Sequence, residues 1–244
     1  STQSRSSAAS DVSKRQHIDY GNANVVFQCN YSYNNEGGFV EILGDNINCG
    51  YRYNISVNDG YREDPNNLSW DKKGKIFWIS NFCGNGNIRC PSTGTFIYNN
   101  TVFVNDSINP EIYFWPNIGD ILMYNNIIYV GSSGQVLPTL IQNNLNSLDI
   151  SHNLFFDSSR INLDVDLENN AFWGDPVLLN PSALGVDDPS MYQLQSNSPI
   201  IGMGKLISGS TDTLNFIQNN GGMDYFGNFV SYVDPPNVGA SNFF

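Results

Sequence analysis

The chain has 244 residues and a formal net charge of −12, because 23 acidic side chains face only 11 basic ones. This surplus of negative charge repels nucleic acid and anionic lipid surfaces, so we expect neither as a partner. No apolar run approaches the roughly 18 residues that a membrane-spanning helix needs. The composition agrees with a secreted protein, extracellular or periplasmic, and the two histidines give little support for a zinc site.

Residues 1–15 show no apolar pattern, and we expect them to form a leader or a partial cap. A repeating pattern begins directly after them and occupies residues 16–175, and residues 176–244 follow as a separate tail. An open end of a repeat would expose unpaired strand edges, which proteins normally cover. We therefore expect the chain to be a piece of a longer protein that lacks its first turns.

The repeat is centred on a recurring asparagine. It is clearest in GTFIYNNTVFVND and DILMYNNIIYV, which place Asn100 and Asn126 at the same position. Neighbouring copies lie 24 to 27 residues apart, except for a gap of 46 before Asn100 and one of 17 before the last copy. We place a weaker copy at Asn81 inside the longer gap, and this period is typical of repeat architectures. The remaining copies carry Asn30, Asn54, Asn153 and Asn170.

Apolar residues alternate with other residues on both sides of this asparagine. They stand five and three residues before it, as do Ile121 and Met123, and one and three residues after it, as do Ile127 and Tyr129. A period of two predicts a short strand on each side and a bend at the asparagine. Each copy can bury its apolar face only against the next copy, about 4.8 Å away. The sequence therefore predicts an all-β fold, a parallel β-solenoid of about seven visible turns with an amide ladder at the bend.

The tail adds a resemblance to a known superfold. DPVLLNP, MYQLQSNSPIIGMGK and NNGGMDYFGNFVSYVDPPNVGA are similar to the closing segment of many secreted bacterial β-helix proteins. Together with the repeat, they make the chain resemble the right-handed parallel β-helix proteins of the pectate-lyase-like superfold from about Gln16 to Ala240. The resemblance implies a right-handed β-helix, a closing segment at residues 176–244 that packs on it, and a carbohydrate-active function. It does not imply one reaction, because this superfold carries many.

The four cysteines divide into two pairs with different expectations. Cys83 and Cys90 bracket GNGNIR, a loop that a disulfide could close, and we expect this pair to be bonded. Cys29 and Cys49 fall in different columns of adjacent turns, and Cys49 stands at an inward apolar position. We expect both to be free thiols. We also expect His152, next to a repeat asparagine, to be structural.

Acidic residues stand just beyond the second strand of several copies. Stacking would bring Glu36 and Asp59, which occupy this place in adjacent turns, to about 5 Å from each other. That spacing suits the two carboxylates of a retaining glycosidase, and it suits a calcium site equally well. The alternative is that both are turn residues next to glycine. Asp19, at the edge of the same turn, is either a further carboxylate of the site or a loop cap.

Several residues could bind a substrate. Arg52 stands two residues before a repeat asparagine and could bind a uronate or a sulfate, whereas Tyr98 and Tyr124, at the same position of neighbouring turns, could form a platform for sugar rings. These residues could equally pack under a loop. The insertion YREDPNNLSWDKKGK crowds charged and aromatic residues together, and long loops on a rigid scaffold tend to carry function. Its candidates for the wall of a cleft are Arg62, Asp64, Trp70 and Lys75, and His17 is a further candidate near the N-terminal edge.

Two classes of function fit these residues, and both have a polysaccharide or oligosaccharide as the partner. The first is a secreted polysaccharide-cleaving enzyme, preferably a glycoside hydrolase that uses Glu36, Asp59 and Asp19. A polysaccharide lyase is the alternative reaction, in which Arg52, Lys75 and His17 could supply the base and neutralise a uronate, although no motif of the known pectate, alginate or chondroitin lyases is present. The second class is a non-catalytic glycan-binding or adhesin-type β-helix, in which the acids would be isolated, hydrogen-bonded turn residues. None of these requires a cofactor, and calcium could bind at Glu36 and Asp59.

Overall fold

A computed structural model describes residues 17–60, 74–104, 110–131, 137–140, 147–157, 168–181, 187–207 and 220–242. The predicted leader, residues 1–15, lies outside them. The described residues form strands and one short 3-10 helix, η1 (Pro189–Tyr192), and contain no α-helix. Within these ranges, no helix has the length and apolar character needed to cross a membrane.

The strands form three sheets, and every pairing between named strands is parallel. Sheet B contains β1 (His17–Ile18), β4 (Val40–Ile42), β7 (Lys75–Ile79), β10 (Glu111–Phe114) and β13 (Leu137–Leu140). Sheet C contains β2 (Val26–Gln28), β5 (Ile47–Arg52), β8 (Ser92–Tyr98), β11 (Gly119–Tyr124), β14 (Ser147–Ser151) and β16 (Glu168–Asn169). Sheet A contains β3 (Tyr31–Tyr33), β6 (Ile55–Val57), β9 (Thr101–Val104), β12 (Ile127–Val130), β15 (Leu154–Phe156) and β17 (Phe172–Trp173).

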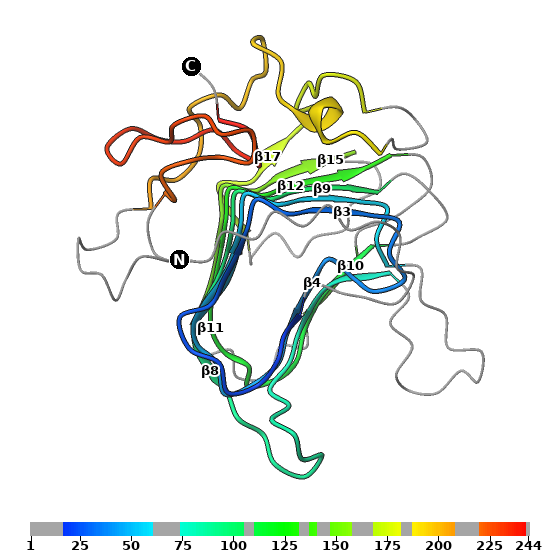
Figure 1. The fold of residues 1–244 in the computed structure, drawn as a ribbon, viewed down its shortest axis with the longest axis vertical. Coiled ribbons are helices and arrows are strands. Elements are labelled where there is room, and N and C mark those ends of the chain that lie inside the picture. The colour runs from blue at the N-terminus through cyan, green and yellow to red at the C-terminus, as the bar shows by residue number, and fades with distance from the viewer. Residues whose placement is uncertain are drawn as a thin grey trace.

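The chain visits the three sheets in a fixed order. From β1 to β15 successive strands belong to sheet B, then C, then A, and β16 and β17 continue sheets C and A; each strand pairs with the equivalent strand of a neighbouring repeat. Figure 1 shows the three sheets around a common interior, with β8 and β11 on one side, β3 and β9 on the second, and β4 and β10 on the third. The predicted all-β fold is confirmed, and its three parallel sheets are consistent with the predicted β-helix.

The recurring asparagines lie at the corner between sheets C and A. The side-chain amide of each donates a hydrogen bond to the side-chain oxygen of the next, at 3.0, 2.9, 2.9 and 2.8 Å from the first pair to the last. The same oxygens also accept hydrogen bonds from backbone N–H groups, so buried polar groups at the corner are paired with one another. We call this chain of amides the asparagine row: Asn30, Asn54, Asn100, Asn126 and Asn153.

The prediction for Asn81 is wrong. Asn81 lies two residues after the end of β7, which pairs with β4 and β10 in sheet B, and the Asn81 side chain donates to the carbonyl of Pro116 at 2.8 Å. Strand β5 pairs directly with β8, with Gly50 opposite Phe96, so the gap of 46 residues is one long repeat and not two.

The prediction that Asn170 is a repeat asparagine is wrong by one residue, because Asn170 lies one position before the column of the asparagine row. Leu154 pairs with Phe172, which aligns Ala171 with Asn153 and aligns Asn170 with His152. The residue before each member of the row has a left-handed backbone, with φ between 50° and 59°, and asparagine adopts this conformation more readily than most residues. This corner column explains the recurrent Asn-Asn pairs, and it consists of Cys29, Tyr53, Asn99, Asn125, His152 and Asn170.

The interior and the two outer faces of sheets A and C form separate apolar clusters. The interior cluster includes Cys49, Ile97, Ile121, Met123 and Phe155, as the columns before the asparagine predict for the first four. The columns after the asparagine, in contrast, point outward from sheet A and pack against Leu178, Tyr192, Leu194, Ile200 and Val238. A third cluster outside sheet C joins Phe96, Tyr98 and Tyr124 to Ile207 and Val230. Residues of the predicted closing segment therefore cover the outer faces of sheets A and C.

Outward-pointing asparagines of the corner column bind the closing segment. Asn99 donates to the carbonyl of Asn237 at 2.7 Å, and Asn125 both donates to the carbonyl of Lys205 and accepts from its backbone N–H at 2.9 and 2.7 Å. The backbone N–H of Gly239 donates to the carbonyl of Asn125 at 2.7 Å. These bonds fix the closing segment, yellow to red in Figure 1, on the side away from β4 and β10.

Candidate functional site

Sheet B presents a polar and aromatic outer face. Its inward residues, such as Val40, Phe77 and Ile112, belong to the interior cluster. Strand side chains alternate between the two faces, so the intervening residues point outward, and Glu41, Trp78 and Tyr113 are aligned across β4, β7 and β10. The two clusters that contain the closing segment include no residue of this face.

Three aromatic rings meet on this face. The ring centroids of Trp78 and Tyr113 are 5.4 Å apart, and Trp115, just after β10, lies 6.4 Å from Trp78 and 6.1 Å from Tyr113. Trp78 is almost covered, with 9% of its surface exposed, whereas Tyr113 and Trp115 are partly exposed. The two partly exposed rings give the face an apolar surface with polar edges.

Charged side chains surround the rings. The Lys75 ammonium lies 4.9 Å from the Trp78 centroid and 4.8 Å from the Tyr113 centroid, and the Arg89 guanidinium lies 5.5 Å from the Trp115 centroid. These distances allow cation–π attraction. Glu111, opposite Lys75 in the register of β7 and β10, adds a carboxylate to the face. Burial, and then the negative charge of Glu111, raise the pKa of Tyr113, so its hydroxyl stays neutral and can donate or accept a hydrogen bond.

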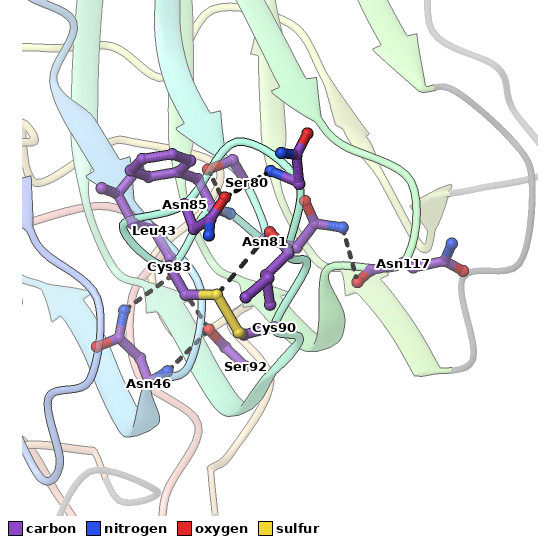
Figure 2. Close-up of a disulfide and its surroundings, with 12 residues drawn as sticks. Leu43, Asn46, Ser80, Asn81, Cys83, Asn85, Cys90, Ser92 and Asn117 are labelled. Carbon is purple, nitrogen blue, oxygen red and sulfur yellow. Dashed lines mark hydrogen bonds between the residues drawn. A yellow bond between two sulfur atoms is a disulfide. The ribbon is translucent and has the colours of Figure 1, made fainter.

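The outer face, Glu41, Lys75, Trp78, Arg89, Glu111, Tyr113 and Trp115, is hereafter the aromatic face. The loop that precedes β8 borders one end of this face. A disulfide between Cys83 and Cys90 closes this loop, so the predicted pairing of the two cysteines is confirmed. Figure 2 shows the disulfide at the base of this loop, with Asn81 directed toward Asn117 and Ser92 between Asn46 and Leu43. Cys29 and Cys49 are not disulfide-bonded, as predicted.

Glu36 and Asp59, the two predicted carboxylates, differ in their burial. Asp59 is fully buried, and its oxygens accept hydrogen bonds from the backbone and side chain of Asn35 and from the hydroxyl of Ser56, at 2.9, 3.1 and 2.6 Å. Burial raises the pKa of Asp59, against the lowering effect of these bonds. The stacking partner of Asp59 in the preceding repeat is therefore Asn35, while Glu36 is partly buried beside it.

Asp19 and His17 lie apart from those acids. Asp19 follows β1 at the end of sheet B that leads to sheet C, whereas Glu36 and Asp59 follow strands of sheet A. The Asp19 carboxylate accepts a hydrogen bond from the backbone N–H of Tyr20 at 2.8 Å, as a loop cap would. His17 begins β1, is exposed, and pairs with Glu41 in the register of the aromatic face.

Arg52, Tyr98 and Tyr124 lie under the closing segment. All three are buried, with 6%, 1% and 6% exposed, and both tyrosines belong to the cluster that contains Val230. Arg52 donates to Gln28 at 2.7 Å and to the Tyr98 hydroxyl at 2.9 Å. These three residues therefore pack under another segment, which is the alternative to sugar binding that the sequence left open.

Tyr124 also belongs to a polar cluster with the closing segment. Its hydroxyl donates to Asp149 at 2.6 Å, and the Lys205 ammonium lies 3.1 Å from the same carboxylate and 3.8 Å from the Tyr124 ring centroid. Burial alone would raise the pKa of Asp149, but the bonds from Tyr124 and Lys205 and the charge of Lys205 lower it. Burial and the nearby Lys205 charge lower the pKa of His152, which keeps the imidazole neutral. This cluster attaches the closing segment to sheet C.

The insertion between β6 and β7 is only partly described. Arg62, Asp64 and Trp70 lie outside the described residues, so their predicted role as a cleft wall stays a prediction. Lys75, at the end of the same insertion, is on the aromatic face. For calcium, the residues that the structure describes contain no group of three or more histidine, cysteine or acidic side chains able to hold a metal ion.

Most of the aromatic face does not follow from the asparagine pattern. With Asn81 as a repeat asparagine, Trp78 falls among inward residues, and the pattern does not select Tyr113, Trp115, Glu41, Glu111 or Arg89. The segments VEI, KIFWI and EIYFW carry a weaker signal, because each mixes apolar residues with charged or aromatic ones in the sheet B strand of its repeat. No protein-family model matches the chain, and a search of curated proteins finds no match.

Proposed function

We propose that the chain is a right-handed parallel β-helix of the pectate-lyase-like kind, exported from the cell, that binds a polysaccharide on its aromatic face. The observation that carries the proposal is the pair of partly exposed rings, Tyr113 and Trp115, 6.1 Å apart and flanked by the cations of Lys75 and Arg89. The C–H surface of a sugar ring packs on aromatic faces, while its hydroxyls need hydrogen-bonding groups at the edges of those faces.

The surroundings of this face support a glycan over other partners. The net charge of −12 disfavours nucleic acid and anionic membranes. An extended polymer suits a face that continues across β4, β7 and β10 at one strand spacing per repeat. The Cys83–Cys90 disulfide is consistent with an oxidising compartment, where a protein meets extracellular polysaccharides.

Cleavage of the bound polysaccharide is the second candidate, and it is favoured by acids on the same face as the rings. Glu111 is opposite Lys75, so a carboxylate and an amine lie beside the surface on which a sugar would stack, and the buried Glu41 is opposite Trp78. A hydrolase would use the carboxylates as acid and base or nucleophile, and a lyase would use an amine or tyrosine as base. Asp59, buried and bonded to Asn35 and Ser56, has the environment of a turn residue.

The test is a glycan array read for binding, followed by assays of reducing-sugar release and of ultraviolet absorbance from unsaturated products. We expect wild type to bind at least one plant, algal or host polysaccharide, and Tyr113→Ala to lose at least about tenfold in affinity, the loss of roughly 1.4 kcal/mol. Trp173→Ala is the matched control, because Trp173 is an exposed ring on sheet A. Absence of binding to the whole array would refute the proposal.

Product formation on the same array separates binding from catalysis. Reducing ends without new absorbance, abolished in Glu111→Gln, would establish a hydrolase at this face. Absorbance growth that is lost in Lys75→Met would establish a lyase. Binding without either product would leave a glycan-binding module.

A further inference from the structure

The loop closed by Cys83 and Cys90 is a small, fixed hairpin. Phe82 and Arg89 pair as an antiparallel bridge, and the backbone N–H of Asn87 donates to the Asn85 side chain at 2.9 Å at the tip. The disulfide joins the two arms beside the bridge. The hairpin therefore has its own cross-links at the base and at the tip, and Arg89 is in one of its arms.

The hairpin is also attached to the neighbouring repeat. The backbone N–H of Gly44 donates to the carbonyl of Phe82 at 2.7 Å, and that of Asp45 donates to the carbonyl of Cys90 at 3.0 Å. Tyr20 packs edge-on against Phe82, with ring centroids 6.1 Å apart. Both arms of the hairpin are thus held at the corner between sheets B and C, next to the end of the aromatic face.

Gly84 is required where the hairpin meets Tyr20. Its φ is +85°, and a Cβ at this position would lie 2.9 Å from the Tyr20 ring and hydroxyl. A larger residue would be strained and would push the ring away. The close approach of backbone to ring at this point is a further contact that fixes the hairpin direction.

This attachment holds an unpaired cation over an aromatic ring. Arg89 is exposed, its guanidinium is 5.5 Å from the Trp115 centroid, and no carboxylate lies within ion-pair distance of it among the described residues. An exposed guanidinium beside a ring can still offer N–H groups to a ligand, and a guanidinium binds carboxylates and sulfates through paired hydrogen bonds.

A second observation at the same place is a set of buried polar atoms without partners. The Trp115 Nε1 donor and the Asn81 Oδ1 acceptor are both buried and unpaired, although the Asn81 amide donates to the carbonyl of Pro116, the residue after Trp115. Asn81 is itself only 4% exposed. Unpaired buried polar groups cost free energy, and an ordered water is one way to complete them.

We propose that Arg89, held by the Cys83–Cys90 hairpin, is the specificity-determining residue of the aromatic face, and that it selects glycans carrying an anionic substituent next to the sugar stacked on Trp115. The inference rests on the proposed glycan binding. A carboxylate and a sulfate share the required chemistry, a planar or tetrahedral group of acceptor oxygens with negative charge. The disulfide acts as a positioning element, because it restricts where Arg89 can place its charge.

The experiment uses an array of matched oligosaccharides that differ only in being neutral, carboxylated or sulfated. We expect wild type to prefer an anionic member over its neutral counterpart by about tenfold, near the lower limit for a charge-assisted hydrogen bond. Arg89→Gln should bring this preference to within about twofold, because the anionic members lose more affinity than the neutral one, and Arg89→Lys should keep part of it. Ile88→Ala, in the same hairpin and exposed, is the control that should behave as wild type.

The Cys83→Ser/Cys90→Ser double variant tests the positioning role. It should lose most of the anionic preference, keep neutral binding, and give an unchanged far-ultraviolet circular dichroism spectrum. The carboxylated and sulfated members decide which anion is the natural one. An anionic preference that survives Arg89→Gln, or wild-type binding that ignores charge, overturns the inference and leaves glycan binding in place. A wild type that binds no member overturns both.

Discussion

Substitution of Asn100 by alanine tests the asparagine row in its middle. Asn100 is fully buried, and its side-chain oxygen accepts from the backbone N–H and the side-chain amide of Asn54 at 3.1 and 2.9 Å. Its amide donates to the carbonyls of Tyr51 and Tyr98 and to the oxygen of Asn126. Alanine at this position therefore removes partners from both neighbouring repeats.

The magnitude follows from the groups left unpaired. Asn100→Ala leaves two N–H groups of Asn54 without their acceptor, one in the backbone and one in the side chain. Each unpaired buried group costs about 1 to 3 kcal/mol, so we expect a loss of about 4 kcal/mol in the free energy of unfolding.

The end of the row supplies the control. In Asn30→Ala the lost bonds are those that the Asn30 amide donates to Gln28 and Asn54, and the Asn54 oxygen still accepts from the Asn30 backbone. No buried donor loses its acceptor, so we expect a loss of about 1 kcal/mol. Urea denaturation, followed by circular dichroism at fixed pH, measures both. A cost for Asn100→Ala that does not exceed that of Asn30→Ala would refute the reasoning.

Three further substitutions test other contacts. Burial raises the pKa of Asp59 in the folded state. The stability that the neutral carboxyl contributes is therefore complete below its ordinary pKa and is lost as the pH rises through the folded pKa. When the pH is raised from about 4 to about 7, the free energy of unfolding in urea should fall less for Asp59→Asn than for wild type. Lys205→Met should cost about 0.5 kcal/mol at neutral pH, because Asp149 and Lys205 are partly exposed; since the pKa of Asp149 is lowered, this cost should vanish as the pH falls through that value, and a pH series of urea midpoints that shows a constant cost would contradict it. Cys83→Ser/Cys90→Ser opens a loop with a sequence separation of 7 and should cost about 2.5 kcal/mol, and an unchanged urea midpoint would exclude a stabilising role for the disulfide.

The asparagine row could be predicted because a buried amide needs a hydrogen-bond partner for both its donor and its acceptor. A buried amide must find partners, and only the same amide one repeat away supplies both a donor and an acceptor at the right spacing. The row therefore repeats as Asn30, Asn54, Asn100, Asn126 and Asn153, and the disulfide between Cys83 and Cys90 could be predicted from the loop that it closes.

The sequence was ambiguous where two neighbouring positions both favour asparagine and where the role of an outward residue depends on whether another segment covers it. The corner column and the row both favour asparagine, so the pair Asn169 and Asn170 could be aligned in two ways, and the shorter last repeat shifted the choice by one residue. Tyr98 and Tyr124 point outward as a sugar platform would, but the closing segment packs on them. A single sequence does not reveal which outer face a distant segment covers, so the face outside the closing segment's two clusters, that of sheet B, could be identified only in three dimensions.

The central claim is that a glycan binds at the rings of sheet B. Titration calorimetry with the best polysaccharide of the array, on wild type, Tyr113→Ala and Trp173→Ala, tests it most directly. We predict that Tyr113→Ala loses at least about tenfold in affinity and that Trp173→Ala binds as wild type does. Full affinity in Tyr113→Ala, or a loss confined to Trp173→Ala, would contradict the account and place the ligand on another face.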